Sequence, residues 1–437
     1  MGRLSRRLST AWLAAMLLAG ALPGAVLGFT GFGETSADAT YGEAMRFGAE
    51  LRGGTPDRLE LLLRFSGDDA VFVAPVAATG DGAEYVWDTA DRHVTPNTRI
   101  EHWWRATHEG RVTESARGTL LYDDDRAGLD WRSQRYGEAT VHWYGDSEAV
   151  ARRFGELAAN GTARAEALLG HEMSGPVDIF VYASSDHFFG ALGPGAREWT
   201  GAATYPALRT IFMSLASGGS AYLETTLVHE VTHVVFNDAT DNPFHEPAKW
   251  LNEGLATWLE DESADAERSE VEFEAGGGGL FAFEAIAEQF PIGERGARLA
   301  YAQGATMVDM IVAEQGRGAI ARIAEAYRDG ASDSEALKAG TGLPSDVLFA
   351  AFYDEFGVDP PQPVEPEPIP PSDVRKPGGQ GPTGTDDPPA SPGSAPDAAA
   401  GGGGVPWLAV TGVTVLLLVA ALAAWAVSRR RATVDSP

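Results

Sequence analysis

An H-E-x-x-H motif restricts the fold of this chain more than any other stretch. His229, Glu230 and His233 lie in an apolar run, residues 227–236, that has helical character. Residues i and i+4 lie on the same face of a helix, so the two imidazoles can share one metal ion while Glu230 faces a water at an open coordination position. Zinc with three protein ligands and one water produces a nucleophile near neutral pH. For the motif alone, the alternative is a helix with two partly buried histidines.

A third ligand is predicted on the next helix. Residues 248–261 have an amphipathic pattern and contain the segment WLNEGLA, in which Glu253 stands among apolar residues. The chain has no cysteine, so a metal site must be built from histidine and carboxylate. His229, His233 and Glu253 would give two imidazoles, one carboxylate and an open position, which is a hydrolytic geometry. The alternative for Glu253 is an ordinary solvated charge on a helix surface.

The segments HEVTH and WLNEGLATWLE resemble the gluzincin metallopeptidases, whose pattern is H-E-x-x-H followed by a downstream N-E. The stretch 139–357 as a whole resembles the bacterial peptidase-MA-like domains. This resemblance implies an α+β, zincin-like catalytic domain with a helical C-terminal half. It implies His229, His233 and Glu253 as zinc ligands, and Glu230 as the general base that takes a proton from the attacking water and passes it to the leaving amine.

The resemblance also implies a second group, in addition to zinc, that stabilises the negative charge developing on the carbonyl oxygen. Tyr301, in a Y-A-Q-G segment of the helical half, is the candidate for that role. Its alternative is core packing, with the hydroxyl satisfied inside the protein. Asn252 and Thr257 are weaker candidates for orienting the metal ligands.

One departure from the resemblance bears on specificity. The aminopeptidase branch, to which WLNEG-A is especially similar, carries a G-x-M-E-N stretch whose glutamate holds the free amine of the substrate. In the corresponding region, residues 201–206, this chain reads GAATYP and has no acidic side chain. We therefore expect an endopeptidase rather than an aminopeptidase.

Composition divides the chain into an N-terminal and a catalytic domain followed by a spacer. Residues 29–136 hold short β-prone runs separated by turn signals, which predicts a small antiparallel β-sandwich-like domain. Residues 137–357 alternate strands and helices and then become helical, and they form the predicted metallopeptidase domain. Residues 358–404 are dominated by Pro, Gly, Ser and Asp, which predicts a disordered spacer.

Both ends of the chain carry targeting patterns. Residues 1–28 have a basic start and an apolar run, as in a secretory signal peptide, with an uncleaved anchor as the alternative. Residues 405–427 are uncharged and apolar, long enough for a membrane helix, which needs about 20 residues. Three arginines at 429–431 begin a predicted cytoplasmic tail, 428–437, and place the catalytic domain outside a bacterial cell membrane.

The partners follow from charge and motif. A formal net charge of -29 disfavours binding to phosphate backbones, so no nucleic acid partner is expected. The predicted partners are a peptide or protein substrate and the membrane; the oligomeric state is left open. Two alternative functions are also compatible with the sequence. One is a catalytically silent surface-binding protein with the same fold. The other is a structural wall-associated protein in which the long spacer carries out the function.

Overall fold

The computed structural model describes residues 28–90, 92–193, 201–291 and 293–361. These fall into two compact units. The first contains the chain up to Phe65, residues 70–92 and residues 99–121; the second contains residues 66–69, 93–98 and the chain from Tyr122 onward. The units thus separate near residue 121, earlier in the chain than the change of pattern seen in the sequence at 136/137.

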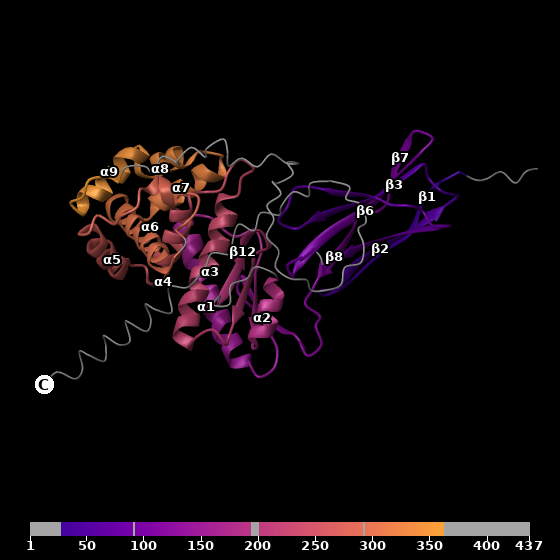
Figure 1. Cartoon of the computed structure of the whole chain (residues 1–437), viewed down its shortest axis with the longest axis horizontal. Coiled ribbons are helices and arrows are strands. Elements are labelled where there is room, and N and C mark those ends of the chain that lie inside the picture. The colour runs from indigo at the N-terminus through magenta and orange to yellow at the C-terminus, as the bar shows by residue number, and fades with distance from the viewer. Residues whose placement is uncertain (1–27, 91, 194–200, 292, 362–437) are drawn as a thin grey trace, which may run out of the picture. The chain divides into compact units, whose positions relative to one another are not determined.

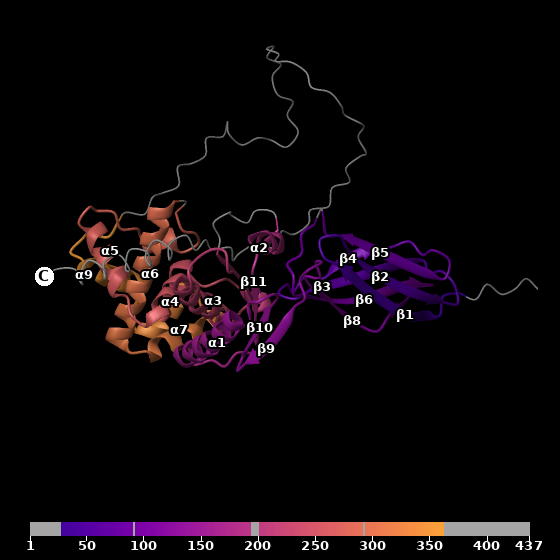
Figure 2. The same ribbon diagram turned by 90° about the horizontal axis from the view of Figure 1, so that it is seen from below.

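Two antiparallel sheets make up the first unit (Figure 2). One contains β1 (Gly31–Thr40), β2 (Ala44–Arg52) and β5 (Gly82–Asp88), and the other contains β3 (Arg58–Phe65), β4 (Phe72–Pro75), β6 (Thr98–His108), β7 (Arg111–Glu114) and β8 (Gly118–Tyr122). Trp87 of β5 packs against Phe65 and Phe72 of the other sheet, with ring centroids 5.2 and 5.0 Å apart. The two sheets therefore pack face to face, as in a β-sandwich.

A five-stranded mixed sheet organises the second unit. Its strands are β9 (Arg132–Tyr136), β10 (Ala139–Trp143), β11 (Val177–Tyr182), β12 (Ala202–Tyr205) and β13 (Thr210–Ser214), in the order β12-β13-β11-β10-β9. The three central strands are parallel, and each edge strand is antiparallel to its neighbour. The short 3-10 helix η1 (Pro206–Leu208) connects edge strand β12 to β13.

Helices cover both faces of this sheet (Figure 1). Alternate residues of a strand point to opposite faces. Ile179 and Val181 of β11 join one apolar core with α1 (Glu148–Leu169) and α3 (Ser220–Thr240). Phe180 and Tyr182 face the other way and pack with α2 (Ser185–Leu192). The H-E-x-x-H helix, α3, therefore lies against the sheet and is held there by apolar contacts.

The C-terminal half of the second unit is helical. It contains α4 (Lys249–Asp261), α5 (Asp265–Ala275), η2 (Phe283–Ile286), α6 (Glu294–Gln315), α7 (Gly318–Arg328), α8 (Asp333–Thr341) and α9 (Ser345–Glu355). The sequence predicted a helical half here and a helix over 248–261, which corresponds to α4, but it did not predict α5, whose pattern is polar. Together with the sheets, these helices confirm the predicted α+β class.

The targeting segments lie almost entirely outside the described residues. This holds for the predicted signal peptide (1–28, apart from Gly28), the spacer (358–404, apart from its first four positions), the membrane helix (405–427) and the tail (428–437). Among the helices that the structure describes, none combines the length and apolarity needed to cross a membrane.

Candidate metal centre

The two motif histidines lie on the buried face of α3. His229 and His233 are 1% and 7% exposed, and their ring centroids are 4.7 Å apart. This is the geometry that the i, i+4 spacing predicts. Apolar residues of α3 pack in the same core as the sheet and α1, so the helix cannot turn its histidines outward without exposing them.

Helix α4 brings Glu253 to these histidines. Its Oε2 atom lies 3.5 Å from Nε2 of His229 and 3.3 Å from Nε2 of His233, and the carboxylate is 2% exposed. One donor atom from each of the three residues falls within 4.8 Å of the others. The structure thus brings together all three residues that the sequence proposed as ligands.

Each histidine is oriented by a side chain of α4 through its other ring nitrogen. Nδ1 of His229 lies 2.9 Å from Oε1 of Glu260, and Nδ1 of His233 lies 2.8 Å from Oδ1 of Asn252. A proton on each Nδ1 is donated to these oxygens, which leaves Nε2, the ring nitrogen that faces Glu253, as the atom that can bind a metal. Asn252 was a sequence candidate for this task. Glu260 was missed, and it, rather than Thr257, contacts His229.

The carboxylate of Glu253 is itself held in place. Lys249, one turn earlier on α4, places Nζ 3.4 Å from Oε1, the oxygen that does not face the histidines. Oε2 of Glu253 and Nε2 of His229 are buried without a hydrogen-bond partner. Buried polar atoms are nearly always satisfied, so two unsatisfied donor atoms facing one point fit a bound cation.

Electrostatics at this point also favour a positive charge. Burial alone would raise the pKa of the Glu253 carboxyl, but the adjacent His233 and His229 hold that pKa well below its usual value. Burial likewise opposes a charge on His229, yet the carboxylates of Glu253 and Glu260 raise its pKa to about 10. Without a metal, the cluster therefore keeps a proton at the position where a cation would neutralise the carboxylates.

Glu230 lies beside this cluster and is 3% exposed. The hydroxyl of Thr204, on edge strand β12, donates a hydrogen bond to its Oε2 atom. Burial raises the pKa of the Glu230 carboxyl, whereas the neighbouring His233 and His229 lower it. A carboxyl group with a raised pKa is suited to accept and return a proton.

Tyr301 approaches from α6. Its ring centroid is 6.1 Å from that of His229, and its hydroxyl is buried without a hydrogen-bond partner. Burial, followed by the charges of Glu253 and Glu230, raises the pKa of Tyr301 well above its usual value, so the hydroxyl stays protonated and can donate. The ring also packs on Phe290, with centroids 5.1 Å apart, so Tyr301 contributes to packing beside the site.

Two glycines allow α6 to come this close. A Cβ on Gly304 would lie 3.1 Å from Cα of Gly254 and would collide with the carbonyl oxygen of Trp250. Gly254 directly follows Glu253, and Gly304 is three residues after Tyr301. The contact between α4 and α6 thus sets the distance between the ligand carboxylate and the tyrosine.

The part of the chain that contains this site matches a known protein family. Residues 157–352 match the sequence profile of the Peptidase MA superfamily. This segment is therefore similar to the Peptidase MA superfamily, a gluzincin-like peptidase family. The match spans α3, α4 and α6, so it includes every candidate site residue, and it supports the predicted gluzincin-like peptidase family. The family match and the His-His-Glu donor set together imply zinc as the cofactor.

Three solved structures show a remote likeness to this chain. The M1 zinc metallopeptidase from Deinococcus radiodurans is 13% identical, over 75% of this chain and 91% of that chain, with a TM-score of 0.37. A two-domain M1 zinc metallopeptidase mutant bound to L-tryptophan is 12% identical, over 78% and 97%, with a TM-score of 0.35. The Br derivative of BhCBM56 is 8% identical, over 22% and 92%, with a TM-score of 0.17. The family assignment therefore rests on the sequence match. No curated protein matches the chain.

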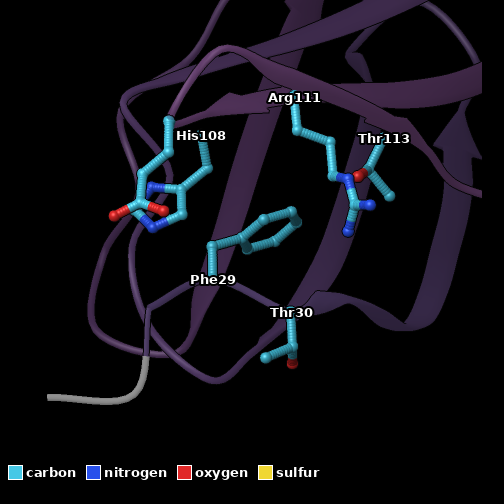
Figure 3. A pocket seen from close by; sticks show the side chains of 6 residues that line it. Phe29, Thr30, His108, Arg111 and Thr113 are labelled. Carbon is cyan, nitrogen blue, oxygen red and sulfur yellow. The ribbon is translucent and has the colours of Figure 1, made fainter. Parts of the chain in front are cut away.

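A separate hollow lies in the first unit (Figure 3). It has a volume of about 400 Å³ and is lined by Phe29, Thr30, His108, Glu109, Arg111 and Thr113. Among the described residues, the grouping suited to a metal is the one on α3 and α4, not this one. The residues that line this pocket are thus different from the three donor residues of the metal centre.

Proposed function

We propose that this chain is a zinc-dependent peptidase whose centre is His229, His233 and Glu253, with Glu230 as general base. The observation that carries the proposal is the convergence of three buried donor atoms within 4.8 Å, two of them without any other partner, directly beside Glu230. Peptide bonds are the substrate class that the match to the Peptidase MA superfamily supports.

Each residue of the site has a separate role in the proposed hydrolysis. When bound, zinc lowers the pKa of water and polarises the carbonyl of the scissile bond. Glu230 accepts the proton of the attacking water and delivers it to the leaving amine. Tyr301 donates its hydroxyl proton in a hydrogen bond to the carbonyl oxygen as negative charge develops there. Because the site is buried, each of these interactions acts in a low local dielectric.

An endopeptidase is the form of this activity that we propose. A free substrate amine needs a carboxylate to hold it, and residues 201–206 along edge strand β12 offer none. The side chain that β12 does present to the site, Thr204, is neutral and is engaged by Glu230. Peptides without a free amine near the cleaved bond should therefore be accepted.

We further propose that the catalytic domain is displayed outside a bacterial cell on a single C-terminal membrane helix. The support is in the sequence: the apolar run 405–427, the arginines at 429–431 and the signal-like segment 1–28. Protease accessibility on intact cells tests this placement. Protection of the catalytic domain in intact cells would contradict it.

The enzymatic proposal is tested by metal analysis together with cleavage of a general protein substrate. We expect one zinc per chain and hydrolysis by the wild type, and retained zinc without hydrolysis in Glu230→Gln. In Glu253→Ala, the zinc content should fall. Bound zinc with no hydrolysis in either the wild type or Glu230→Gln would favour the rival reading, a silent binding protein.

A further inference from the structure

The general base and the metal ligands are held by different parts of the fold. All three candidate ligands are anchored by side chains of α4, as described above. Glu230 is anchored instead by Thr204, which belongs to edge strand β12 of the sheet. The orientation of the base is therefore coupled to the sheet edge, and that of the ligands to α4.

The contact between Thr204 and Glu230 lies in a dry environment. Both side chains are 3% exposed. A hydrogen bond to a charged acceptor is stronger there than in water. Thr204 is fixed in turn by pairing of its strand with β13, where it lies opposite Ile211, and its branched side chain has few rotamers.

We propose that Thr204 is a positioning residue for the general base, an inference that rests on the proposed function. The last torsion of a glutamate side chain is broad and turns easily. With Oε2 held by the Thr204 hydroxyl, the carboxylate plane is fixed and Oε1 is presented to the attacking water. Thr204 touches neither substrate nor metal and acts only through Glu230.

Two variants of Thr204 in the zinc-loaded full chain test this role. Thr204→Val keeps the side-chain shape but removes the hydroxyl, and we expect kcat to fall by about tenfold or more, with little change in KM and unchanged zinc content. Thr204→Ser keeps the hydroxyl and should restore most of kcat. Binding of acetohydroxamate, which coordinates zinc and shares its proton with a neighbouring base, should weaken by about tenfold in Thr204→Val and recover in Thr204→Ser.

Thr162→Val provides the matched control. Thr162 is a buried residue of α1 whose hydroxyl has no hydrogen-bond partner, so the same change should leave kcat and hydroxamate binding as in the wild type. Unchanged kcat and hydroxamate affinity in Thr204→Val would overturn the proposal, as would an equal loss in Thr204→Ser or loss of zinc from Thr204→Val. A wild type that binds zinc but cleaves no protein would instead contradict the proposed function, and hydroxamate binding would still test Thr204.

Discussion

Nδ1 of His229 lies 2.9 Å from Oε1 of Glu260, a carboxylate two helical turns after Glu253 on the same helix. One face of α4 therefore supplies both a candidate ligand for the metal and the side chain that orients another ligand. The two carboxylates approach the imidazole of His229 from opposite ring nitrogens. Fixing the ring in this way favours metal binding, because the Nε2 lone pair needs no reorientation.

Removal of the Glu260 carboxylate should weaken zinc binding. In Glu260→Ala, His229 loses the acceptor for its Nδ1 proton, and we expect zinc affinity to fall by about 10- to 100-fold. Competition with a chromophoric chelator measures this affinity. Glu314→Ala, a change of an exposed carboxylate on α6, is the control and should bind zinc as the wild type does. Equal affinity in the two variants would show that Glu260 does not support the metal centre.

Removal of the Tyr301 hydroxyl should affect catalysis and not stability. The hydroxyl has no hydrogen-bond partner in the folded chain, so Tyr301→Phe leaves no group unsatisfied. If the hydroxyl stabilises the oxyanion, kcat should fall by about 100- to 1,000-fold while the zinc content and the unfolding midpoint stay unchanged. Steady-state kinetics with metal analysis and thermal unfolding measure these quantities.

Tyr353→Phe is the matched control for Tyr301. The Tyr353 hydroxyl donates to the carbonyl oxygen of Phe281 over 2.8 Å, away from the metal centre. Its loss should lower the free energy of unfolding by about 1 kcal/mol and leave kcat unchanged. If Tyr301→Phe were as active as Tyr353→Phe, Tyr301 would be a packing residue.

The close crossing of α4 and α6 should tolerate no side chain at Gly304. In Gly304→Ala, the new Cβ would collide with the backbone of Trp250 and Gly254, which cannot move aside as a side chain can. We expect a loss of about 1–3 kcal/mol in the free energy of unfolding, together with a lower kcat, because Tyr301 moves with α6. Gly276→Ala, where the added Cβ meets only ordinary contacts, should be close to neutral in denaturant titrations. A neutral Gly304→Ala would mean that the helices separate freely.

The sequence predicted the parts of this site that depend on local spacing. His229 and His233 face one point because they are one turn apart on a helix, and Glu253 could be assigned because its segment resembles a known pattern. The helix ends were predictable for similar reasons: the strong apolar pattern of 248–261 corresponds closely to α4, Lys249–Asp261. Helix α5, Asp265–Ala275, was missed because its pattern is polar and gives no apolar face.

The anchoring contacts were not predictable, because they depend on how distant elements pack. Thr204 reaches Glu230 only because the sheet edge lies against α3, and nothing in GAATYP marks that threonine. Glu260 lies two turns after Glu253, a spacing that in retrospect placed it on the same face of α4. The Gly254–Gly304 contact joins residues whose helices are separated in sequence by α5 and η2.

Stability should depend on pH through Glu267. Burial, and then the nearby acidic groups Glu260, Asp261 and Asp265, raise the pKa of the Glu267 carboxyl from 4.5 to about 7. The folded chain therefore holds a proton on Glu267 that the unfolded chain releases at lower pH, so folding becomes less favourable as pH rises from about 5 to about 7. Above that range the half-buried charge of Glu267 lowers the free energy of unfolding of the wild type by its full amount. Glu267→Gln has no charge at this position and loses nothing.

Glu267→Gln should therefore match the wild type in the free energy of unfolding at pH 5 and exceed it at pH 8 by roughly 1–2 kcal/mol, a figure reduced for the partial exposure of the side chain. Denaturant titrations at the two pH values measure the difference. Glu272→Gln, on the same helix but with a side chain that is 60% exposed, should show no such pH-dependent gain. A gain of equal size at pH 5 and pH 8 would indicate improved packing rather than removal of a charge, and would contradict the raised pKa.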